Sequence, residues 1–268
     1  MKNIYKISLF IVAFLTFTSC ALDDDAPASN GDPITFVSLD KSGVVSTQGS
    51  AGESVSISLS NVLNTDTKIE YNLNGSDEVL MMEAGSSSFT LDFPTGTGVA
   101  NTLKLTSAVG LYNNVALGDN TSVTFIGLPP PNPNAIEALA FNSTGGDNFW
   151  FGLSSFDSAG NWVTDYNQNS AAGHPRPMSI PLNGNGNLGA IPNSADVAPN
   201  YLALNVFTQG TVPNPTGITV YLVMPDGSFQ VFESSVPSTF FQDNPVVAVT
   251  VEDDSANPGM KSYTFSAI

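Results

Sequence analysis

Val55-Ser56-Ile57-Ser58-Leu59-Ser60 alternates strictly between apolar and hydroxyl side chains, and Lys68-Ile69-Glu70-Tyr71-Asn72-Leu73 repeats the same period soon afterwards. Successive side chains of an extended chain point to opposite faces, so each segment presents one apolar and one polar face. This pattern is typical of a strand in an antiparallel sheet that covers a core on one side and meets water on the other. The two segments therefore predict a β-protein.

Similar short runs continue to the C-terminus, separated by clusters of Gly, Asn, Asp and Ser, while helical periodicity is nearly absent. The predicted strands are 34–39, 55–60, 68–73, 89–93, 102–106, 122–126, 136–141, 149–156, 161–166, 178–182, 201–207, 218–224, 228–233, 246–252 and 262–267. Met224–Ser228, with Asp226-Gly227 at its centre, and Asp157–Asn161 predict two hairpin turns. Residues 173–200, rich in Gly, Pro and Asn, predict a long loop.

Residues 129–134 read Pro-Pro-Pro-Asn-Pro-Asn. Proline has no backbone N–H and cannot continue a sheet ladder, so this segment predicts a stiff, extended linker. We therefore expect a domain of residues 33–128, the linker, and a larger domain of residues 135–268.

Residues 34–127 resemble the immunoglobulin-like and Calx-β-like sandwiches of bacterial surface proteins, through Gly52–Leu59, Ala84–Leu91 and Thr102–Thr106. The resemblance implies an Ig-like sandwich. Calcium-binding Calx-β domains carry paired acidic residues in loops, and Asp77-Glu78 is the only adjacent acidic pair in this region, so calcium is not expected there. The predicted fold class is all-β, with two antiparallel β-sandwich domains: the Ig-like domain and then a larger sandwich or jelly roll.

The N-terminus has a positive start, an apolar stretch from Ile7 to Phe17, and Thr18-Ser19 before Cys20, the only cysteine. The stretch is too short to span a bilayer and predicts a secretory signal peptide over residues 1–19. Cys20 in this setting looks like the lipobox of bacterial lipoproteins, although Phe17 replaces the usual Leu. The resemblance implies a diacylglycerol and an acyl chain such as palmitate on Cys20, and chains of that number hold a protein stably in a membrane.

Residues 20–32 would then form a lipidated acidic tether. Asp23-Asp24-Asp25 resembles the signal that sends Bacteroidota lipoproteins to the outer face of the outer membrane. The alternative is a solvated spacer of mutually repelling charges on a lipoprotein that stays at the periplasmic face. With its thiol in a thioether the mature chain forms no disulfide, so stability must come from packing.

The charge balance excludes nucleic acid as a partner. The chain has 7 Lys and Arg against 24 Asp and Glu, a net charge of −17, and Arg176 is its only arginine. Binding to a phosphate backbone needs clustered basic side chains. The same lack of basic side chains excludes electrostatic attraction to anionic lipids. The N-terminal lipid is therefore the predicted link to the membrane.

Catalysis is not expected. His174 is the only histidine, and no nucleophile-elbow sequence accompanies it. Zinc sites need several His or Cys ligands. A pair of glycosidase carboxylates is set by the fold and leaves no sequence motif, so that alternative stays open.

Calcium is the metal that the acidic residues of the second domain would suit, and no other cofactor is expected. Asp253 and Asp254 follow a predicted strand, and Asp147, Asp157, Asp165 and Asp243 lie in or near predicted turns. Calcium takes such oxygen ligands from loops. The opposing interpretation is that an acidic chain forms such clusters by chance.

An aromatic hairpin supplies the candidate ligand site. If Phe149, Phe151 and Leu153 face the core, alternation turns Trp150 outward. An exposed tryptophan on a sheet can stack on a sugar ring, and we name Trp150, Trp162, Tyr166 and Asp147 as ligand-binding candidates. Tyr221 would extend that platform. The alternative is that Trp150 packs under the long loop or against the first domain.

Asp157-Ser158-Ala159 and Asp254-Ser255-Ala256 repeat a short motif in predicted turns. It resembles the acceptor for protein O-glycosylation in Bacteroidota, which implies Ser158 and Ser255 as modified residues.

These features together predict an outer-membrane, surface-exposed lipoprotein that acts as a non-catalytic binding module, with glycan as its ligand. The alternative is a structural or adhesion protein whose partners are surface proteins.

Overall fold

The computed structural model describes residues 33–48, 52–93, 98–142, 149–169, 175–208, 215–237 and 242–268. Within these ranges the chain is almost entirely β-structure in four mostly antiparallel sheets, which confirms the predicted all-β sandwich class. The predicted signal peptide (1–19), the tether (20–32) with Cys20, and the residues Asp147 and His174 lie outside the described residues. No helix in the described ranges is long and apolar enough to cross a membrane.

The first nine strands form two sheets, ordered β6-β3-β1-β8 and β2-β9-β7-β4-β5. They are β1 (Thr35–Leu39), β2 (Gly43–Gln48), β3 (Glu53–Leu59), β4 (Thr67–Leu73), β5 (Ser76–Met82), β6 (Ser88–Phe93), β7 (Ala100–Gly110), β8 (Val115–Leu117) and β9 (Ser122–Leu128). The alternation that predicted β3 is confirmed, because Val55, Ile57 and Leu59 are buried. Two pairings, β1 with β8 and β2 with β9, are parallel rather than antiparallel.

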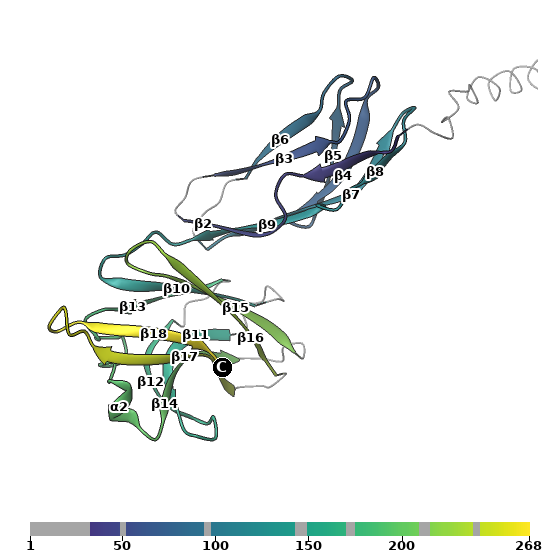
Figure 1. Ribbon diagram of the computed structural model, residues 1–268. Coiled ribbons are helices and arrows are strands. Elements are labelled where there is room, and N and C mark those ends of the chain that lie inside the picture. The colour runs from purple at the N-terminus through teal and green to yellow at the C-terminus, as the bar shows by residue number, and fades with distance from the viewer. Residues whose placement is uncertain are drawn as a thin grey trace, which may run out of the picture. The chain divides into compact units, whose positions relative to one another are not determined.

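The later strands form the sheets β13-β10-β15-β16 and β12-β11-β14-β17-β18 (Figure 1). They are β10 (Ala135–Asn142), β11 (Phe149–Phe156), β12 (Trp162–Asn169), β13 (Arg176–Pro181), β14 (Tyr201–Thr208), β15 (Thr216–Val223), β16 (Phe229–Val236), β17 (Gln242–Asp253) and β18 (Lys261–Ala267), with a short helix α2 (Ser194–Val197). All nine strands predicted in this half are present, and both predicted hairpin turns are confirmed.

Two compact units emerge from the contacts within the chain. The described residues of Met1–Ser42, Val55–Leu91 and Leu103–Ser122 form the first unit, and those of Gly43–Ser54, Asp92–Thr102 and Val123–Ile268 form the second. Residues 129–134 connect β9 to β10. The division into domains at this linker stays a prediction.

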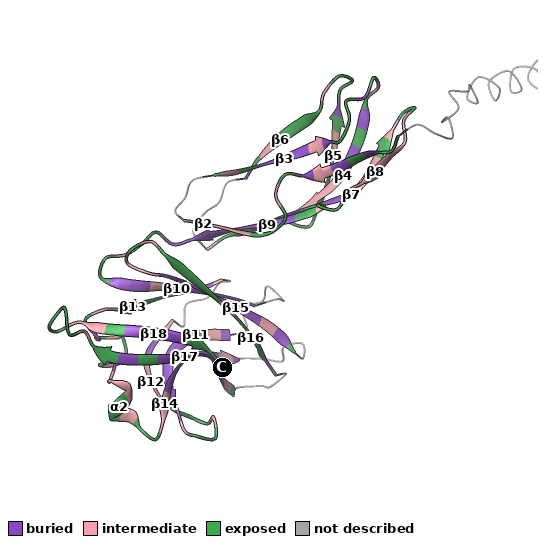
Figure 2. Cartoon of the chain, in the orientation of Figure 1, coloured by how far each residue is buried: buried purple, intermediate pink, exposed green. Residues whose placement is uncertain are grey.

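The core of the second unit lies between its two later sheets. Buried side chains from every one of these strands except β12 fill it, among them Phe149, Phe151 and Leu153 of β11 and Val236 of β16. Tyr166 of β12 is partly buried and packs against this cluster. Hairpins such as β11–β12, β15–β16 and β17–β18 keep neighbours in sequence within one sheet, so this is a sandwich rather than a jelly roll. Figure 2 shows β10 mostly buried and β16 mostly exposed.

Strand β10 is buried on both faces because a second apolar cluster covers the other side of its sheet. Leu139 and Phe141 of β10 meet Tyr221 and Val223 of β15, together with Ile126 and Leu128 of β9, within the second unit. Tyr221 is only 4 % exposed, and its ring packs edge-on against Phe141 at 5.7 Å. The expectation that Tyr221 extends an exposed aromatic platform is therefore wrong.

The exposed edge of β12 is covered by the Asn- and Gly-rich segment 182–190. The side chain of Asn187 accepts a hydrogen bond from the Gln168 backbone N–H at 3.0 Å and donates one to the Gln168 carbonyl at 2.7 Å. It thus makes the pair of bonds that a neighbouring strand would make. A Cβ at Gly186 would lie 2.2 Å from the Tyr166 carbonyl oxygen, so only glycine lets this segment approach the edge.

The Asn187→Ala substitution should lower the free energy of unfolding by about 1–2 kcal/mol, because two backbone groups of β12 lose their partner. Urea unfolding followed by tryptophan fluorescence measures this, since both tryptophans lie on β11 and β12. Asn185→Ala is the matched control, because the Asn185 side chain has no hydrogen-bond partner among the described residues. Equal destabilisation by the two changes would contradict a specific role for Asn187.

Candidate functional site

Strand register places aromatic and acidic side chains in one row on the outer face of the five-stranded sheet. Trp150 of β11 lies opposite Phe207 of β14, and Phe207 lies opposite Asp243 of β17. The rings of Trp150 and Phe207 are 5.7 Å apart with an interplanar angle of 49°. Because the neighbours of Trp150 along β11 point into the core, its predicted outward orientation is confirmed.

Strand β12 adds three side chains to the same face: Trp162, Asp165 and Gln168. Residues three apart in a regular strand point to opposite faces. Here the β11–β12 pairing shifts register twice, between Leu153 and Ser154 and between Ser155 and Phe156. These irregularities bring all three side chains to the outer face, where they pair with β11 residues from Phe156 to Gly152.

The six side chains line an open cavity of about 250 Å³. Trp150, Trp162 and Phe207 supply aromatic surface, while Asp165, Asp243 and Gln168 supply polar groups. Gly152 lies opposite Gln168, and a Cβ there would come within 2.8 Å of the Asn167 carbonyl oxygen. Glycine at this position therefore permits the close approach of β12 that closes one side of the cavity.

A chain of hydrogen bonds links the two carboxylates through the sheet. Ser154 donates to Asp165 Oδ1 at 2.5 Å and accepts from Asn205 Nδ2 at 3.1 Å. Asn205 Nδ2 also donates to Asp243 Oδ1 at 2.5 Å, and its Oδ1 accepts from the Asn244 backbone N–H at 3.0 Å. Ser154 and Asn205 are 0 % and 1 % exposed. Both carboxylates thus rest on a buried polar layer whose hydrogen-bonding capacity is largely used.

The indole N–H of Trp162 donates to the same Oδ1 of Asp165 at 2.9 Å. This bond holds the ring beside the carboxylate, although Trp162 is 47 % exposed. The orientation of the tryptophan is therefore fixed within the protein itself, and a side chain fixed in this way would lose less entropy if a ligand bound to it.

The two carboxylates differ in environment. Burial raises the pKa of Asp243, the hydrogen bond from Asn205 opposes that rise, and the negative charge of Asp165 adds to it. Both groups border the same cavity and are linked through Ser154 and Asn205, so their negative charges repel each other when both are ionised.

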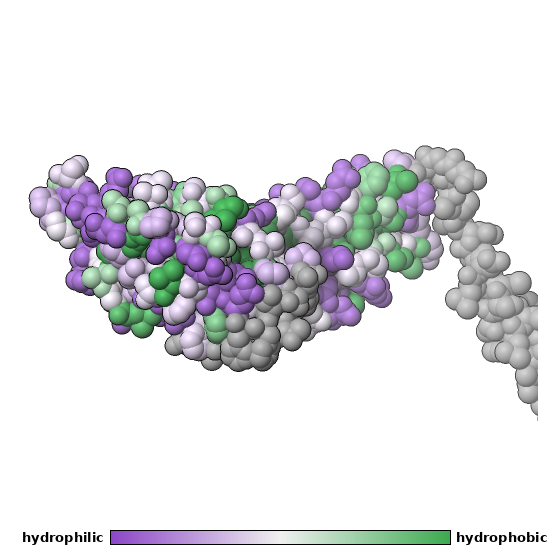
Figure 3. Space-filling view, turned by 90° about the horizontal axis from the view of Figure 1, so that it is seen from below, coloured by the Kyte–Doolittle hydropathy of each residue, from purple (hydrophilic) through white to green (hydrophobic). Residues whose placement is uncertain are grey.

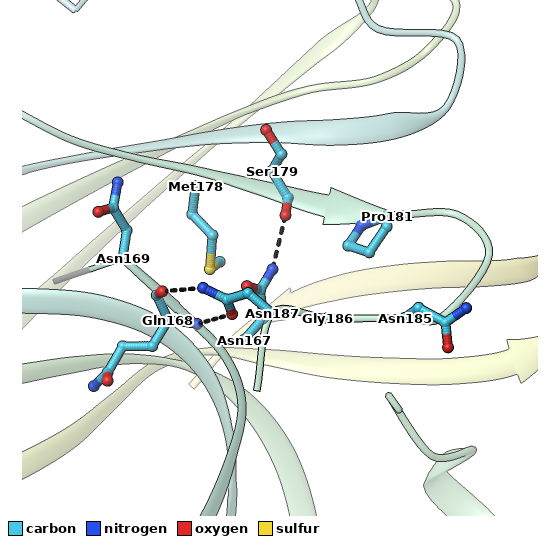
Figure 4. Close-up of a pocket in the computed structure, with 9 residues that line it drawn as sticks. All are labelled: Asn167, Gln168, Asn169, Met178, Ser179, Pro181, Asn185, Gly186 and Asn187. Carbon is cyan, nitrogen blue, oxygen red and sulfur yellow. Dashed lines mark hydrogen bonds between the residues drawn. The ribbon is translucent and has the colours of Figure 1, made fainter. Parts of the chain in front are cut away.

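A second cavity of about 440 Å³ lies on the other side of β12, between the edges of the two sheets (Figure 4). Its lining is rich in amides: Asn167, Gln168, Asn169, Asn185 and Asn187, with Met178, Ser179, Pro181 and Gly186. Asn167 and Asn169 donate across the gap to the carbonyls of Ser179 and Pro177. Figure 4 shows the Gln168 side chain pointing away from Met178 and Ser179. Gln168 lines both cavities.

Two of the four predicted ligand-binding residues meet in the first cavity. Trp150 and Trp162 line it, whereas Tyr166 packs against the core between the sheets. Asp147 lies outside the described residues.

The predicted metal ligands Asp253 and Asp254 make contacts within the protein. Asp253 forms an ion pair with Lys261 at 2.8 Å and accepts a bond from Asn193; these hydrogen bonds lower its pKa. Asp254 accepts bonds from the Ala256 backbone N–H and the Asn257 side chain. No cluster of three or more His, Cys, Asp or Glu suited to a metal occurs in the described residues. Calcium binding stays a prediction.

The two Asp-Ser-Ala motifs form closely similar turns. Asp157 Oδ1 accepts from the Ala159 N–H at 2.9 Å, as Asp254 Oδ1 accepts from the Ala256 N–H at 2.8 Å. In each turn the other oxygen accepts from a nearby Asn side chain. Ser158 and Ser255 are exposed there, and their glycosylation stays a prediction.

Sequence reasoning did not name Phe207, Gln168, Ser154 or Asn205 as site residues. It did note Asp165 and Asp243, but as calcium ligands in or near predicted turns; both lie in strands, β12 and β17. The available signal in the sequence was an Asp in each of two strands that also carry or adjoin aromatic residues. That these side chains come together in one cavity depends on strand pairing, which the sequence pattern does not show.

Asp243→Asn should stabilise the folded protein near neutral pH, by less than about 1 kcal/mol because the carboxyl is partly in water. A carboxyl whose folded pKa is raised favours folding below its ordinary pKa and loses that contribution as pH rises through the raised value. The gain from Asn should therefore vanish below about pH 4, where Asp is neutral in both states.

Urea unfolding across the acid range measures this difference. Asp226→Asn is the control with the opposite sign, because hydrogen bonds from Ser228 lower the pKa of Asp226. A gain from Asp243→Asn that does not change with pH would contradict the assigned cause.

No protein-family model matches this chain, and a search of curated proteins finds no match either.

Proposed function

We propose that this protein is a surface lipoprotein that acts as a non-catalytic glycan-binding module, with the cavity of Trp150, Trp162 and Phe207 holding a sugar ring. The single observation that carries the proposal is this aromatic cavity on the outer face of a sheet, with carboxylates and an amide at its border. Sugar rings have apolar C–H faces that stack on aromatic rings, and their hydroxyls bond to carboxylates and amides.

The size of the cavity suits one ring of a larger ligand. Its volume of about 250 Å³ lies below the range of about 300–1,000 Å³ that is usual for drug-sized molecules. The adjoining amide-lined cavity offers further hydrogen-bonding groups, and Gln168 lies between the two. An oligosaccharide with one ring against the tryptophans would extend over β12 toward those amides.

The arrangement of the carboxyls favours binding over hydrolysis. Glycosidases place two carboxyl groups on either side of the scissile bond. Asp165 and Asp243 rise from the same face of one sheet and are tied to one layer through Ser154 and Asn205. A ring lying on that face would meet both from the same side.

A protein-binding role is the second candidate, and exposed apolar residues of the first unit favour it. Val79 and Met81 of β5 and Val109 of β7 are each more than half exposed and flank β4 on both sides. Figure 3 shows hydrophobic residues gathered on one area of the first unit, whereas hydrophobic and hydrophilic residues are interspersed on the second. Exposed apolar area of this kind can bind another protein.

Trp150→Ala should weaken glycan binding at least about tenfold, since a stacked aromatic contact contributes about 0.5–1.5 kcal/mol beyond the apolar area that it buries. A glycan array followed by calorimetry on the array's best ligand measures the effect. Phe229→Ala is the matched control, because Phe229 is an exposed aromatic residue on β16 of the other sheet. Absence of glycan binding, or binding indifferent to Trp150→Ala, would favour the protein-partner candidate.

Cys20→Ser should release the protein from the membrane fraction of its host, because the lipid is the proposed anchor. Intact-mass measurement of the unaltered protein should show a chain that begins at Cys20 and carries the lipid. Protease added to whole cells should digest it if the acidic tether directs surface export. A Cys20→Ser protein that stays with the membrane would contradict lipid anchoring, and resistance on intact cells would place the protein at the periplasmic face.

A further inference from the structure

We infer that the cavity selects a sugar ring that carries a protonated amine, so that the ligand class is an amino-sugar glycan rather than a neutral one. The inference rests on the proposed glycan-binding function and names the ligand of that site. Three features of the cavity carry it: its aromatic walls, its paired carboxylates and the absence of a basic side chain among the described residues that line it.

The aromatic walls attract cations. Trp150, Trp162 and Phe207 expose ring surfaces whose faces are electron-rich. An ammonium group over such a face gains roughly 0.5–2 kcal/mol, with tryptophan the strongest partner. A hydroxyl at the same place gains no such attraction.

Within the part of the chain that the structure describes, the two carboxylates have no basic partner. Neither Asp165 nor Asp243 has an ion pair among the described residues, where Lys68 pairs with Glu70 and Lys261 with Asp253. Every hydrogen bond that the described residues make to the two groups ends on Oδ1, and none of these residues bonds to either Oδ2. Arg176, the only arginine, lies over the ring of Phe149, which faces the core.

An ammonium group would relieve the repulsion between the two carboxylates. Burial is the main cause that raises the pKa of Asp243, and the negative charge of Asp165, which borders the same cavity, adds to the rise. A cation bound beside both groups replaces repulsion by two attractions in a partly buried setting, where charges are screened less than in bulk water. A neutral ring leaves the repulsion in place.

The aromatic walls favour an organic cation over calcium. Calcium requires six to eight oxygen ligands, and the cavity offers the two carboxylates and the Gln168 amide beside three rings. An ammonium group needs fewer polar contacts and uses the ring faces as well.

Three β-1,4-linked trimers test the inference: those of glucose, N-acetylglucosamine and glucosamine, which differ only at C2 (hydroxyl, acetamido, ammonium). Calorimetry is run on the full mature chain at about pH 6, where carboxylates are ionised and the amine is protonated. We expect the glucosamine trimer to bind at least about tenfold more tightly than either neutral trimer, and high salt to reduce that ratio.

Asp165→Asn and Asp243→Asn should each remove most of the preference and leave the weaker binding of the neutral trimers in place. Asp226→Asn, in the exposed turn between β15 and β16, is the charge-matched control and should retain the preference. Trp150→Ala should weaken all three trimers.

Equal affinity for the three trimers, or a preference that survives both Asp→Asn changes, would overturn the inference and leave the glycan-binding proposal standing. Failure of the folded protein to bind any trimer or any glycan on an array would overturn the proposed function and the inference together.

Discussion

Burial of two inner sheet faces in one apolar core is the constraint on which the second unit depends. Phe149, Phe151 and Leu153 of β11 are all fully or almost fully buried in that core. If the two faces of β11 were exchanged, these three large side chains would be exposed to water. Burial of each one contributes about 1.5–3 kcal/mol to the stability of the fold. Trp150 is thereby held on the outer face, and its orientation is a consequence of packing on the other side of the sheet.

The same alternation made the strands and the orientation of Trp150 predictable from sequence, and β11 has the predicted bounds, 149–156. Strands β2, β5 and β8 were not predicted. Strand β5 is largely exposed and lacks an apolar period. The rest of the site depends on pairing between distant segments. Phe207 and Asp243 reach Trp150 only through the β11–β14 and β14–β17 registers, and Asp165 joins Gln168 only through a bulge. A local pattern contains no information about either.

The buried polar layer of Ser154 and Asn205 is hard to explain by stability alone. Apolar side chains of similar size at these positions would pack without any need for hydrogen bonds, and buried polar groups stabilise a fold only when every partner is satisfied. Here the hydrogen bonds of Ser154 and Asn205 go to two carboxylates, Asp165 and Asp243, that repel each other. An arrangement that lowers stability while fixing the positions of charged groups is typical of a binding site.

The candidate site borders β12, the strand at the end of its sheet. A central strand has backbone hydrogen-bond partners on both sides. Its outer side chains therefore point straight out from the sheet. Strand β12 has β11 on one side, while on the other the side chain of Asn187 satisfies the backbone of Gln168. The strand is therefore protected from pairing with another chain and still borders a cavity on each side. An extended ligand can cross such an edge, whereas a ligand on the middle of the sheet would meet only one surface.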